Sequence, residues 1–567
     1  MKTGLVAVAL SLTGTVAQAV THTFDIVIYG SSPAAISTAI QARRMGKSAV
    51  IVSPETRIGG LTTGGLGQTD IGNKKAFGGL ALEFYTAVAD YYAKDENWIW
   101  QKRSEYVSGE QSSQKTTKSM WTFEPSAALK ILEGWERRDG LVIHRNKWLD
   151  RTKGKVKVEE LEVEGPARTR RIASFVTLDE TEYRGKVFVD ATYEGDLMAA
   201  AGVSYFVGRE ANAVYGETIS GIQVSHARSH QFMPGISPYV VEGDSSSGLL
   251  PWIEPYNPDE KDGDGDHRLQ AYSFRMCLTD VPENRIPFVK PDNYDPRNYE
   301  LLVRNLIASE RQHPEWATSD NDWLGIPWIN SKMPNRKTDT NNSSGFSTDF
   351  IGQNWEWPEA TYERRHEIAQ AHLDYQQGLM WTLANEPRIP ARIRKIVSRW
   401  GTCKDEFIGE RGNGWQNQLY VREARRLVGA CVMTENHCWG KVKASCPVAK
   451  AAYTMDSHNV RRRVGKDGFV HNEGDVEEGW EELGNNPYGI EYAAITPKED
   501  ECANLFVPVC LSASHMAFGS IRMEPVFFAL GQVAGTAAAL AIDADVPVQK
   551  VDYGMLAARL KADGQVF

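Results

Sequence analysis

The sequence predicts an α/β protein built around a parallel sheet, and consecutive segments near its N-terminus carry this prediction. Residues 24–29 form an apolar run typical of a buried strand that ends at Gly30. An alanine-rich helix then runs from Pro33 to about Met45, and residues 48–53 form a second apolar strand. A strand, a helix and a strand in this order and at this spacing indicate a Rossmann-like dinucleotide-binding unit.

The turn between the first strand and the helix is similar to a glycine-rich phosphate-binding turn, with two substitutions. The usual Gly-x-Gly-x-x-Gly pattern is replaced by Gly30-x-Ser32-x-x-Ala35. Gly30 still permits the tight turn, and Ala35 is small enough for the helix to pack closely on the strand. We expect the Ser32 hydroxyl to donate to a phosphate. Pro33 and Ala34 begin the helix, whose N-terminus attracts anions. The alternative is a unit of this shape that binds no phosphate.

The end of the second strand holds the candidate contacts for a ribose. Ser53 occupies the position where an acidic residue usually binds the ribose hydroxyls, and Glu55 follows two residues later. Next comes a segment with five Gly in nine residues, which lets the backbone pass close to a flat ligand. A flexible surface loop is the alternative. The candidate contacts in this segment are Gly59, Gly60, Leu61, Thr62, Gly64, Gly65 and Leu66.

Later segments extend the predicted sheet. A helix begins at Pro125 and runs to about Arg138, and residues 140–144 supply a third parallel strand. Residues 173–178 and 182–190 are expected to form a hairpin. The apolar stretch at residues 526–541 contains Gly and other small residues, so it predicts a buried helix rather than a membrane span.

Several motifs in combination resemble one flavoprotein family. Residues 28–34 and 59–66 are similar to those of the FAD-dependent oxidoreductases often labelled xanthan-lyase-like, within the glutathione-reductase-type flavoprotein superfamily. Further similar segments are residues 187–196, 271–279, 337–342, 419–426 and 509–525. The resemblance implies FAD as the cofactor. It adds Ala191, Thr192, Ser520, Ile521 and Arg522 to the candidate cofactor contacts, and Trp148 is a further candidate.

The resemblance also implies how the chain is organised. We expect a FAD-binding domain that is split in sequence, with one part at residues 20–202 and the other at residues 490–567. A large mixed α+β insert at residues 203–489 is expected to supply the substrate and cap domain. No internal repeat of 20–50 residues is visible.

The first 19 residues read as a secretory signal peptide. Lys2 precedes the apolar run Leu5–Leu12, and Ala17-Gln18-Ala19 supplies a cleavage site of small residues. The alternatives are an N-terminal anchor or a buried strand. A signal peptide predicts a secreted, extracellular enzyme. Because Asn341 and Asn342 each begin an N-x-S pattern, the sequence also predicts a glycoprotein, although a structural role for these residues competes.

Composition limits the partners. With 73 acidic against 63 basic side chains and a net charge of -10, the chain is a poor candidate for binding nucleic acid or an anionic membrane. A small-molecule substrate is expected, with oxygen as the electron acceptor, and the oligomeric state stays open. No metal site is predicted. The seven Cys form no C-x-x-C pair, the acidic run 262–266 lacks the Gly that a calcium loop needs, and His366 and His372 are six positions apart.

Flavin chemistry needs a base and a positive charge near the ring. His515 is the candidate base, since imidazole titrates near neutral pH, and Arg522 is the candidate for stabilising negative charge. Arg422, with Arg425 and Arg426 on a short helix, is expected to clamp an anionic or polyhydroxylated substrate. His372 and His437 are weaker catalytic candidates.

These features predict a secreted FAD-dependent oxidase or dehydrogenase. It would transfer a hydride from a hydroxylated small molecule, such as a sugar derivative or secondary metabolite, to the flavin N5, and oxygen would reoxidise the flavin. The alternatives are a polysaccharide lyase, as the family label suggests, and a non-catalytic flavin-binding protein.

Overall fold

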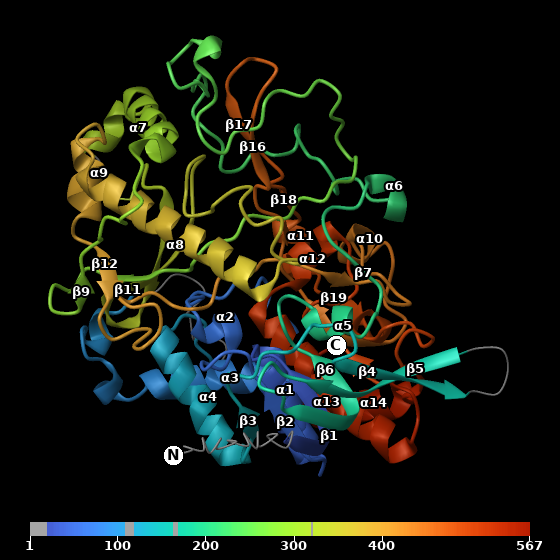
Figure 1. Ribbon diagram of the computed structural model, residues 1–567. Coiled ribbons are helices and arrows are strands. Elements are labelled where there is room, and N and C mark those ends of the chain that lie inside the picture. The colour runs from blue at the N-terminus through green and yellow to red at the C-terminus, as the bar shows by residue number, and fades with distance from the viewer. Residues whose placement is uncertain (1–19, 108–117, 163–167, 319–320, 322) are drawn as a thin grey trace, which may run out of the picture.

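The computed structural model describes residues 20–107, 118–162, 168–318, 321 and 323–567. The expected signal peptide lies outside these residues and stays a prediction. Within the described part, the chain forms one large, mainly parallel sheet covered by helices, and a second part rich in loops above it (Figure 1). The predicted α/β class is confirmed.

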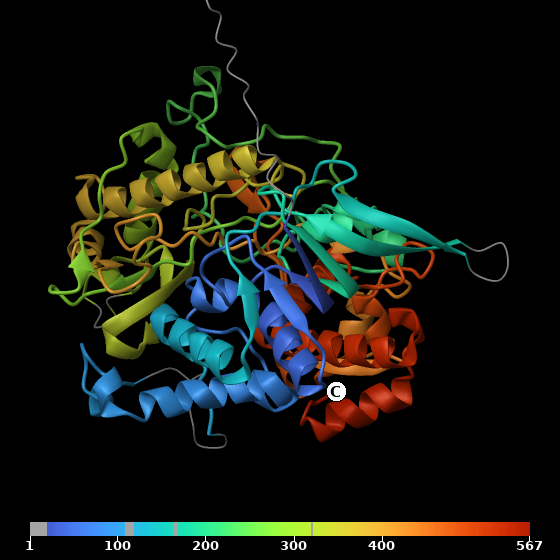
Figure 2. The ribbon, with the colours of Figure 1, turned by 60° about the horizontal axis from the view of Figure 1, so that its bottom comes forward.

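A seven-stranded sheet lies at the centre of the first part. Its strands are β1 (Thr21–Tyr29), β2 (Ala49–Val52), β3 (Val142–His144), β4 (Val156–Glu162), β5 (Arg168–Val176), β6 (Glu182–Asp190) and β20 (Leu505–Phe506). The order is β3-β2-β1-β6-β5-β4, with β20 also paired to β6. β1 is parallel to β2 and β6, and β3 and β20 extend the parallel set. The three parallel strands and the β5–β6 hairpin confirm the predictions. β4 and β5 project from the body of the molecule (Figure 2).

Two helices that are distant in sequence pack side by side against this sheet. They are α1 (Pro33–Arg44) and α13 (Glu524–Ala544), and α1 also contacts β1 and β2. Around them lie α3 (Gly79–Tyr92), α4 (Pro125–Asp139) and α14 (Tyr553–Ala562). By length and composition α13 would suffice to span a bilayer, but 89% of its apolar window is buried. Its packing against α1, α3 and β14 (Pro447–Ala451) accounts for its apolar sequence, as predicted for a buried helix.

Glycines let α1 and α13 approach closely. A Cβ at Gly535 would lie 2.6 Å from the Thr38 carbonyl oxygen, and one at Gly531 would lie 2.6 Å from Ala34 Cα. The Thr38 hydroxyl donates to the Gly531 carbonyl at 2.9 Å. The contact therefore fixes the C-terminal segment on the first helix of the chain.

The second part of the molecule contains a smaller sheet and a long helix. The sheet has the order β10-β11-β8-β12-β9, and the helix α8 contacts α9 (Figure 1). The elements are β8 (Cys277–Thr279), β9 (Arg285–Ile286), β10 (Trp328–Met333), β11 (Lys337–Asn342), β12 (Gly401–Cys403), α7 (Glu300–Gln312), α8 (Tyr362–Asn385) and α9 (Ala391–Val397). Asn342 is buried at the end of β11 and Asn341 is half-buried, and glycosylation there stays a prediction.

Short elements complete the described chain. Pairs of strands form between β7 and β13, β14 and β19, β15 and β18, and β16 and β17. These elements are α2 (Gly60–Thr63), α5 (Asp196–Ala200), β7 (Tyr205–Phe206), α6 (Asn212–Tyr215), β13 (Arg426–Leu427), α10 (Glu435–Cys438), β15 (Met455–Asp456), β16 (Arg461–Val464), β17 (Val470–Glu473), β18 (Glu477–Glu478), α11 (Trp480–Asn485), β19 (Tyr488–Glu491) and α12 (His515–Ile521).

A buried lysine ties the two parts together. Lys337 at the start of β11 is 2% exposed. Its Nζ lies 2.8 Å from Glu124, which precedes α4, and 2.9 and 2.7 Å from Asp405 and Glu406. A buried ammonium requires such partners, because desolvation would otherwise expel it. The domain boundaries expected at residues 202 and 489 stay predictions.

The prediction of a short helix around Arg422 is wrong. Residues 421–425 have no regular structure, and Arg426 begins β13. An extended backbone sends neighbouring side chains to opposite sides, so each arginine reaches a different buried carboxylate. The pairs are Arg422 with Asp349, Arg425 with Asp196, and Arg426 with Glu210.

The close contact of α1 and α13 predicts opposite effects for two helical glycines. Gly531→Ala should destabilise the protein by about 1–3 kcal/mol, because the new methyl group overpacks the contact. Gly134→Ala in α4 is the matched control. It meets no atom within 4 Å and should stabilise the protein by about 1 kcal/mol through helix propensity. Urea unfolding measures both, and equal shifts in the two variants would contradict the packing argument.

Candidate active site

A cavity of about 990 Å³ opens at the carboxyl ends of β1, β2, β3 and β6. This volume lies at the upper end of the range for small-molecule and cofactor sites, which is about 300–1,000 Å³. β1 lies between β2 and β6 in the sheet. On one side of β1 the strand order continues to β2 and β3, and on the other side it continues to β6, β5 and β4, so the strand order reverses direction at β1. Open α/β sheets bind their ligands in the crevice that such a reversal creates.

The turn after β1 forms one wall of the cavity. Gly30 has φ +116°, and a Cβ there would lie 2.6 Å from the Ala191 carbonyl carbon at the end of β6. The Ser32 hydroxyl donates to the Ala191 carbonyl oxygen at 2.7 Å, so its hydrogen is used within the protein instead of pointing to a phosphate. Gly30, Ser32, Ala191 and Thr192 all line the cavity. Pro33 and Ala34 lie behind them in the buried first turn of α1.

The two ribose candidates at the end of β2 differ in their position relative to the cavity. Glu55 lines the cavity. Ser53 is fully buried, and its hydroxyl bonds to the backbone of Glu55. Burial, together with the charges of Glu194 and Glu410, raises the pKa of Glu55 to about 7. Glu55 therefore presents the acidic group that the sequence pattern places two residues earlier.

The remaining walls come from several elements. Trp148, 37% exposed, is a predicted contact that lines the cavity. The sequence did not reveal the wall that α8 and the loop before Tyr420 provide, because these residues are far from β1 in the chain and all but Leu419 lie outside the recognised motifs. That wall includes Trp357, Arg365, Leu373, Gln377, Arg411, Asn417, Gln418 and Leu419.

The glycine-rich segment lies in a layer beneath the cavity, not among its lining residues. Its glycines accommodate other parts of the protein. A Cβ at Gly60 would lie 2.9 Å from the Tyr193 ring, and one at Gly64 would lie 2.8 Å from Gln418 Cβ. Gly65 faces the backbone of Arg275 in the same way. Gly59, Leu61, Thr62 and Leu66 are also buried, and their contact with a cofactor stays a prediction.

A buried glutamate links this layer to the C-terminal helix. Glu524, the first residue of α13, accepts bonds from the Thr62 hydroxyl at 2.6 Å and the Tyr193 hydroxyl at 3.0 Å. Tyr193 in turn accepts from the Leu61 N–H at 2.9 Å. Burial raises the pKa of Glu524 to about 7. Three segments that are far apart in the sequence are thereby held together directly below the cavity.

Tyr420 directly follows the cavity-lining Leu419 and belongs to a cluster of buried charged and aromatic groups. We name it the Asp456 cluster. Arg522 donates to the Tyr420 hydroxyl oxygen at 3.0 Å and lies 3.2 Å from the Asp456 carboxylate. His458 Nδ1 lies 2.8 Å from Asp349, and its Nε2 lies 3.9 Å from Asp456. The cluster consists of Asp349, Tyr420, Arg422, Asp456, His458 and Arg522.

The tyrosine is held by cations on its ring. The guanidinium groups of Arg422 and Arg275 lie over the Tyr420 ring, at 4.5 and 5.5 Å from its centre. Arg275 is itself fixed by two hydrogen bonds of 2.7 Å to Asp339. Because the Tyr420 hydroxyl oxygen accepts a hydrogen bond from Arg522, the hydroxyl hydrogen of Tyr420 points away from Arg522.

The proton affinities in the cluster differ sharply. Burial raises the pKa of Asp456 to about 8 against the attraction of Arg522, and the charges of Glu477 and Asp475 add to the rise. Burial and the charge of Arg422 lower the pKa of His458 to about 3. The imidazole is therefore neutral, and the bond to Asp349 assigns its proton to Nδ1. Groups tuned apart in this way are characteristic of acid–base sites.

The other histidine candidates lie outside this cluster. His515 at the start of α12 is buried, with its Nδ1 3.0 Å from Glu423. His372 is buried in α8, where its Nδ1 contacts the Ile368 carbonyl, and burial lowers its pKa to about 4. His437 in α10 contacts Thr434, and burial lowers its pKa as well. Their catalytic roles stay predictions.

Of the C-terminal candidates, the structure brings only Arg522 into the Asp456 cluster. Ile521 is fully buried next to it. The Ser520 hydroxyl is occupied by Tyr488 and by the Tyr453 carbonyl. Asp456 and His458 were missed because neither lies in a recognisable motif, and their partners are more than 60 positions away.

A sheet reversal, a helix N-terminus beside the crevice and a cavity of about 990 Å³ at the carboxyl ends of the strands together define a dinucleotide-binding protein. The model of the family described as FAD dependent oxidoreductase matches residues 25–560, so the chain belongs to that family. The expected family is confirmed, and the protein is an FAD-dependent oxidoreductase with FAD as its cofactor. The xanthan-lyase-like subgroup stays a prediction.

Solved structures show weaker similarities. A flavin monooxygenase from Stenotrophomonas maltophilia is 15% identical over 33% of this chain and 41% of its own, with a TM-score of 0.18. THI4 from Thermovibrio ammonificans is 14% identical over 33% of this chain and 66% of its own, with a TM-score of 0.22. An L-amino acid deaminase from Proteus vulgaris is 14% identical over 35% and 55%, with a TM-score of 0.21. No curated protein matches the chain.

The cavity residues fit FAD. The Gly30 turn and the N-terminus of α1 suit its pyrophosphate, because backbone N–H groups and the helix dipole attract anions there. Glu55 suits the ribose hydroxyls. The close approach of Gly30 to the end of β6 leaves this wall open to a ligand, since no side chain fills the turn.

Gly30→Ala should weaken FAD binding by at least about tenfold, which corresponds to about 1.4 kcal/mol. The added Cβ collides with the Ala191 backbone and displaces the turn. Gly46→Ala is the control, since Gly46 also has positive φ (+74°) but no atom within 4 Å of its Cβ. That variant should lose about 1–2 kcal/mol of stability and keep its flavin. Flavin absorbance after reconstitution measures both, and wild-type affinity in Gly30→Ala would refute the assignment.

The raised pKa of Asp456 predicts a pH-dependent stability. The folded protein holds this proton up to about pH 8, whereas the unfolded chain releases it near 3.8. Stability should therefore fall as pH rises between these values, and Asp456→Asn should make that fall shallower. Asp349→Asn should lower the free energy of unfolding by the same amount at every pH from about 5 to 8. Arg422 and His458 keep the pKa of Asp349 low despite its burial, so this carboxylate stays ionised over that range. Parallel pH curves for wild type and Asp456→Asn would contradict the assignment.

Proposed function

We propose that this enzyme is an oxidase or dehydrogenase that takes a hydride and a proton from a hydroxylated small molecule. The Asp456 cluster carries the proposal. It places a carboxyl group of pKa about 8, a neutral imidazole and a guanidinium together in a buried cluster, and its residue Tyr420 directly follows the cavity-lining Leu419. When bound, FAD supplies the acceptor for the hydride at its N5 position.

The residues of the cluster handle the proton. An ionised Asp456 takes the proton from the substrate hydroxyl, and its pKa of about 8 suits it to both take up and release that proton near neutral pH. His458 Nε2, which is unprotonated, lies 3.9 Å from Asp456, so the imidazole adds no positive charge beside this carboxyl group. Arg522 stabilises negative charge on the substrate oxygen, and the Tyr420 hydroxyl can donate to the same atom.

The cellular setting and the domain organisation are also part of the proposal. Lys2, the apolar run after it and the Ala17-Gln18-Ala19 site support secretion, and a secreted flavoenzyme would use oxygen as its acceptor and release peroxide. The pairing of β20 with β6 supports a FAD domain that is split around a substrate and cap insert.

A polysaccharide lyase is the second candidate, because the same cluster supplies a base and a positive charge. A lyase would need no hydride acceptor, so it leaves the Gly30 turn and its cavity without a catalytic task. A flavin-binding protein without activity would make no use of the raised pKa of Asp456.

Substrate screening decides among these functions. A panel of sugars, alcohols and amines is added to the yellow protein without oxygen, and a true substrate should bleach the flavin absorbance. Admitting oxygen should then restore the colour and release peroxide. Unsaturated products formed while the flavin stays oxidised would support the lyase, and no reaction across the panel would support the binding protein.

With a substrate in hand, Asp456→Asn should slow flavin reduction by about 10²–10⁴-fold, the usual contribution of a general base. The flavin content should stay unchanged, because Asp456 does not line the cavity. The control is His471→Gln, which changes the exposed residue of the otherwise buried strand β17, and its flavin should be reduced at the wild-type rate. Unaltered reduction kinetics in Asp456→Asn would remove Asp456 from the mechanism.

A further inference from the structure

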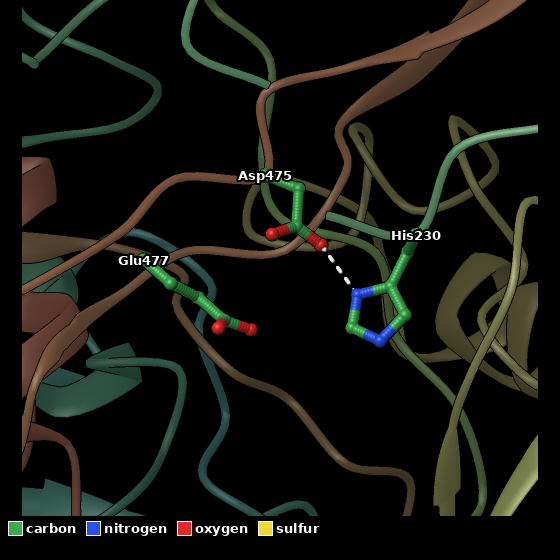
Figure 3. A group of neighbouring side chains, drawn as sticks. All are labelled: His230, Asp475 and Glu477. Atoms are coloured by element: carbon green, nitrogen blue, oxygen red, sulfur yellow. Dashed lines mark hydrogen bonds and ion pairs between the residues drawn. The ribbon is translucent and has the colours of Figure 1, made fainter. Parts of the chain in front are cut away.

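We infer that His230, Asp475 and Glu477 form a binding site for a divalent transition-metal ion beside the Asp456 cluster (Figure 3). One imidazole nitrogen and two carboxylate oxygens from these residues lie within 4.8 Å of one another. The inference does not depend on the proposed function. It also goes beyond the sequence, which predicts no metal site, since His230 and Asp475 are 245 positions apart.

The backbone places the three side chains for a common ligand. Asp475 and Glu477 are two positions apart in the extended segment that enters β18, so both point to the same side. His230 approaches from a loop and has φ +51°, in the left-handed region. That conformation costs about 1–2 kcal/mol for an L-residue.

One oxygen of Asp475 lacks a partner in the protein. Its Oδ2 lies 3.0 Å from His230 Nδ1 and 3.5 Å from Asn459 Nδ2. Its Oδ1 is buried and accepts no hydrogen bond from any described residue, although the side chain is only 2% exposed. Figure 3 shows this second oxygen on the side of Glu477. An unpaired buried carboxylate oxygen is costly, and a cation bound between the two acids would satisfy it.

The local charge also calls for a cation. Among the residues that the structure describes, no Lys or Arg forms an ion pair with Asp475 or Glu477. Glu473, two residues before Asp475, pairs with both Arg209 and Arg461. The Asp475 and Glu477 carboxylates lie close together and repel each other, with the His230 imidazole as the basic side chain beside them. A divalent ion would relieve this repulsion.

The donor set identifies the class of ion. Imidazole suits zinc, iron and nickel, and carboxylates suit manganese, so one nitrogen and two oxygens fit a first-row divalent ion. Calcium would need about 6–8 oxygen ligands, more than the site offers. Ligands about 2.0–2.2 Å from one ion lie no more than about 4.4 Å apart. The exposed Glu477 side chain can make the small inward movement that this requires.

The site borders the candidate chemistry. Glu477 on β18 lies opposite Asp456 on β15 in the strand pairing. With only three protein ligands, a bound ion would keep positions open for water or for an oxygen of the substrate. The metal site would therefore share one wall with the place where the Asp456 cluster receives its substrate.

Metal titration of the intact, FAD-loaded protein tests the inference. Tag-free protein is treated with a chelator, dialysed, and titrated in a calorimeter with Zn²⁺ and separately with Mn²⁺. One ion should bind per chain. His230→Ala, Asp475→Asn and Glu477→Gln should each weaken that binding by more than about tenfold, as expected for loss of a ligand.

Matched controls separate this site from other surface groups. Glu478→Gln changes the neighbouring exposed acid of β18, and His471→Ala removes a histidine that contacts only Asp467 among the described acidic residues. Both should bind the ions like wild type. Absence of Zn²⁺ and Mn²⁺ binding, or binding that survives in His230→Ala and Glu477→Gln, would overturn the inference. If Asp475→Asn fails to fold, the exposed Glu477→Gln variant decides.

Discussion

The contact between the turn after β1 and the end of β6 is the constraint on which the rest of the structure depends. Gly30 permits it because a side chain there would overlap the Ala191 backbone. The turn then directs α1 along the sheet, with its N-terminus at the cavity. α13 packs on α1 through Gly531 and Gly535, so the C-terminal segment is drawn to the same place. Arg522, just before α13, thereby reaches the Asp456 cluster.

Buried ion pairs hold the second part of the molecule against the sheet. Lys337 forms ion pairs with three carboxylates. Arg425, directly before β13, forms an ion pair with Asp196 at the start of α5. Because desolvation of a charge is expensive, each of these cations is matched by acidic partners. Asp456 and Asp475 differ from this pattern, the first by its high pKa and the second by its unpartnered oxygen. We propose that a group from outside the protein completes each arrangement, a substrate at Asp456 and a metal ion at Asp475.

Local patterns were sufficient to predict much of the fold. Apolar runs and glycine positions located β1, α1, β2 and the long helices, since burial of a strand or helix leaves a periodic trace in the sequence. Arg422 shows where this fails. It was expected to lie on a short helix with Arg425 and Arg426. Each of those two arginines instead forms an ion pair with a carboxylate that is more than 200 positions away in the chain. Long-range partners outweigh local propensity at such buried positions.

For the site, the sequence by itself determined the cofactor class and located the turn after β1, which lines the cavity. The signal there is local, because the Gly30 turn and the helix that follows it are consecutive. Only the tertiary structure decided that Glu55 and not Ser53 faces the cavity, and that Asp456 and His458 lie beside Arg522. These groups come from separate segments. Their pKa values and contacts arise from burial and from neighbouring charges, which exist only once the chain has folded.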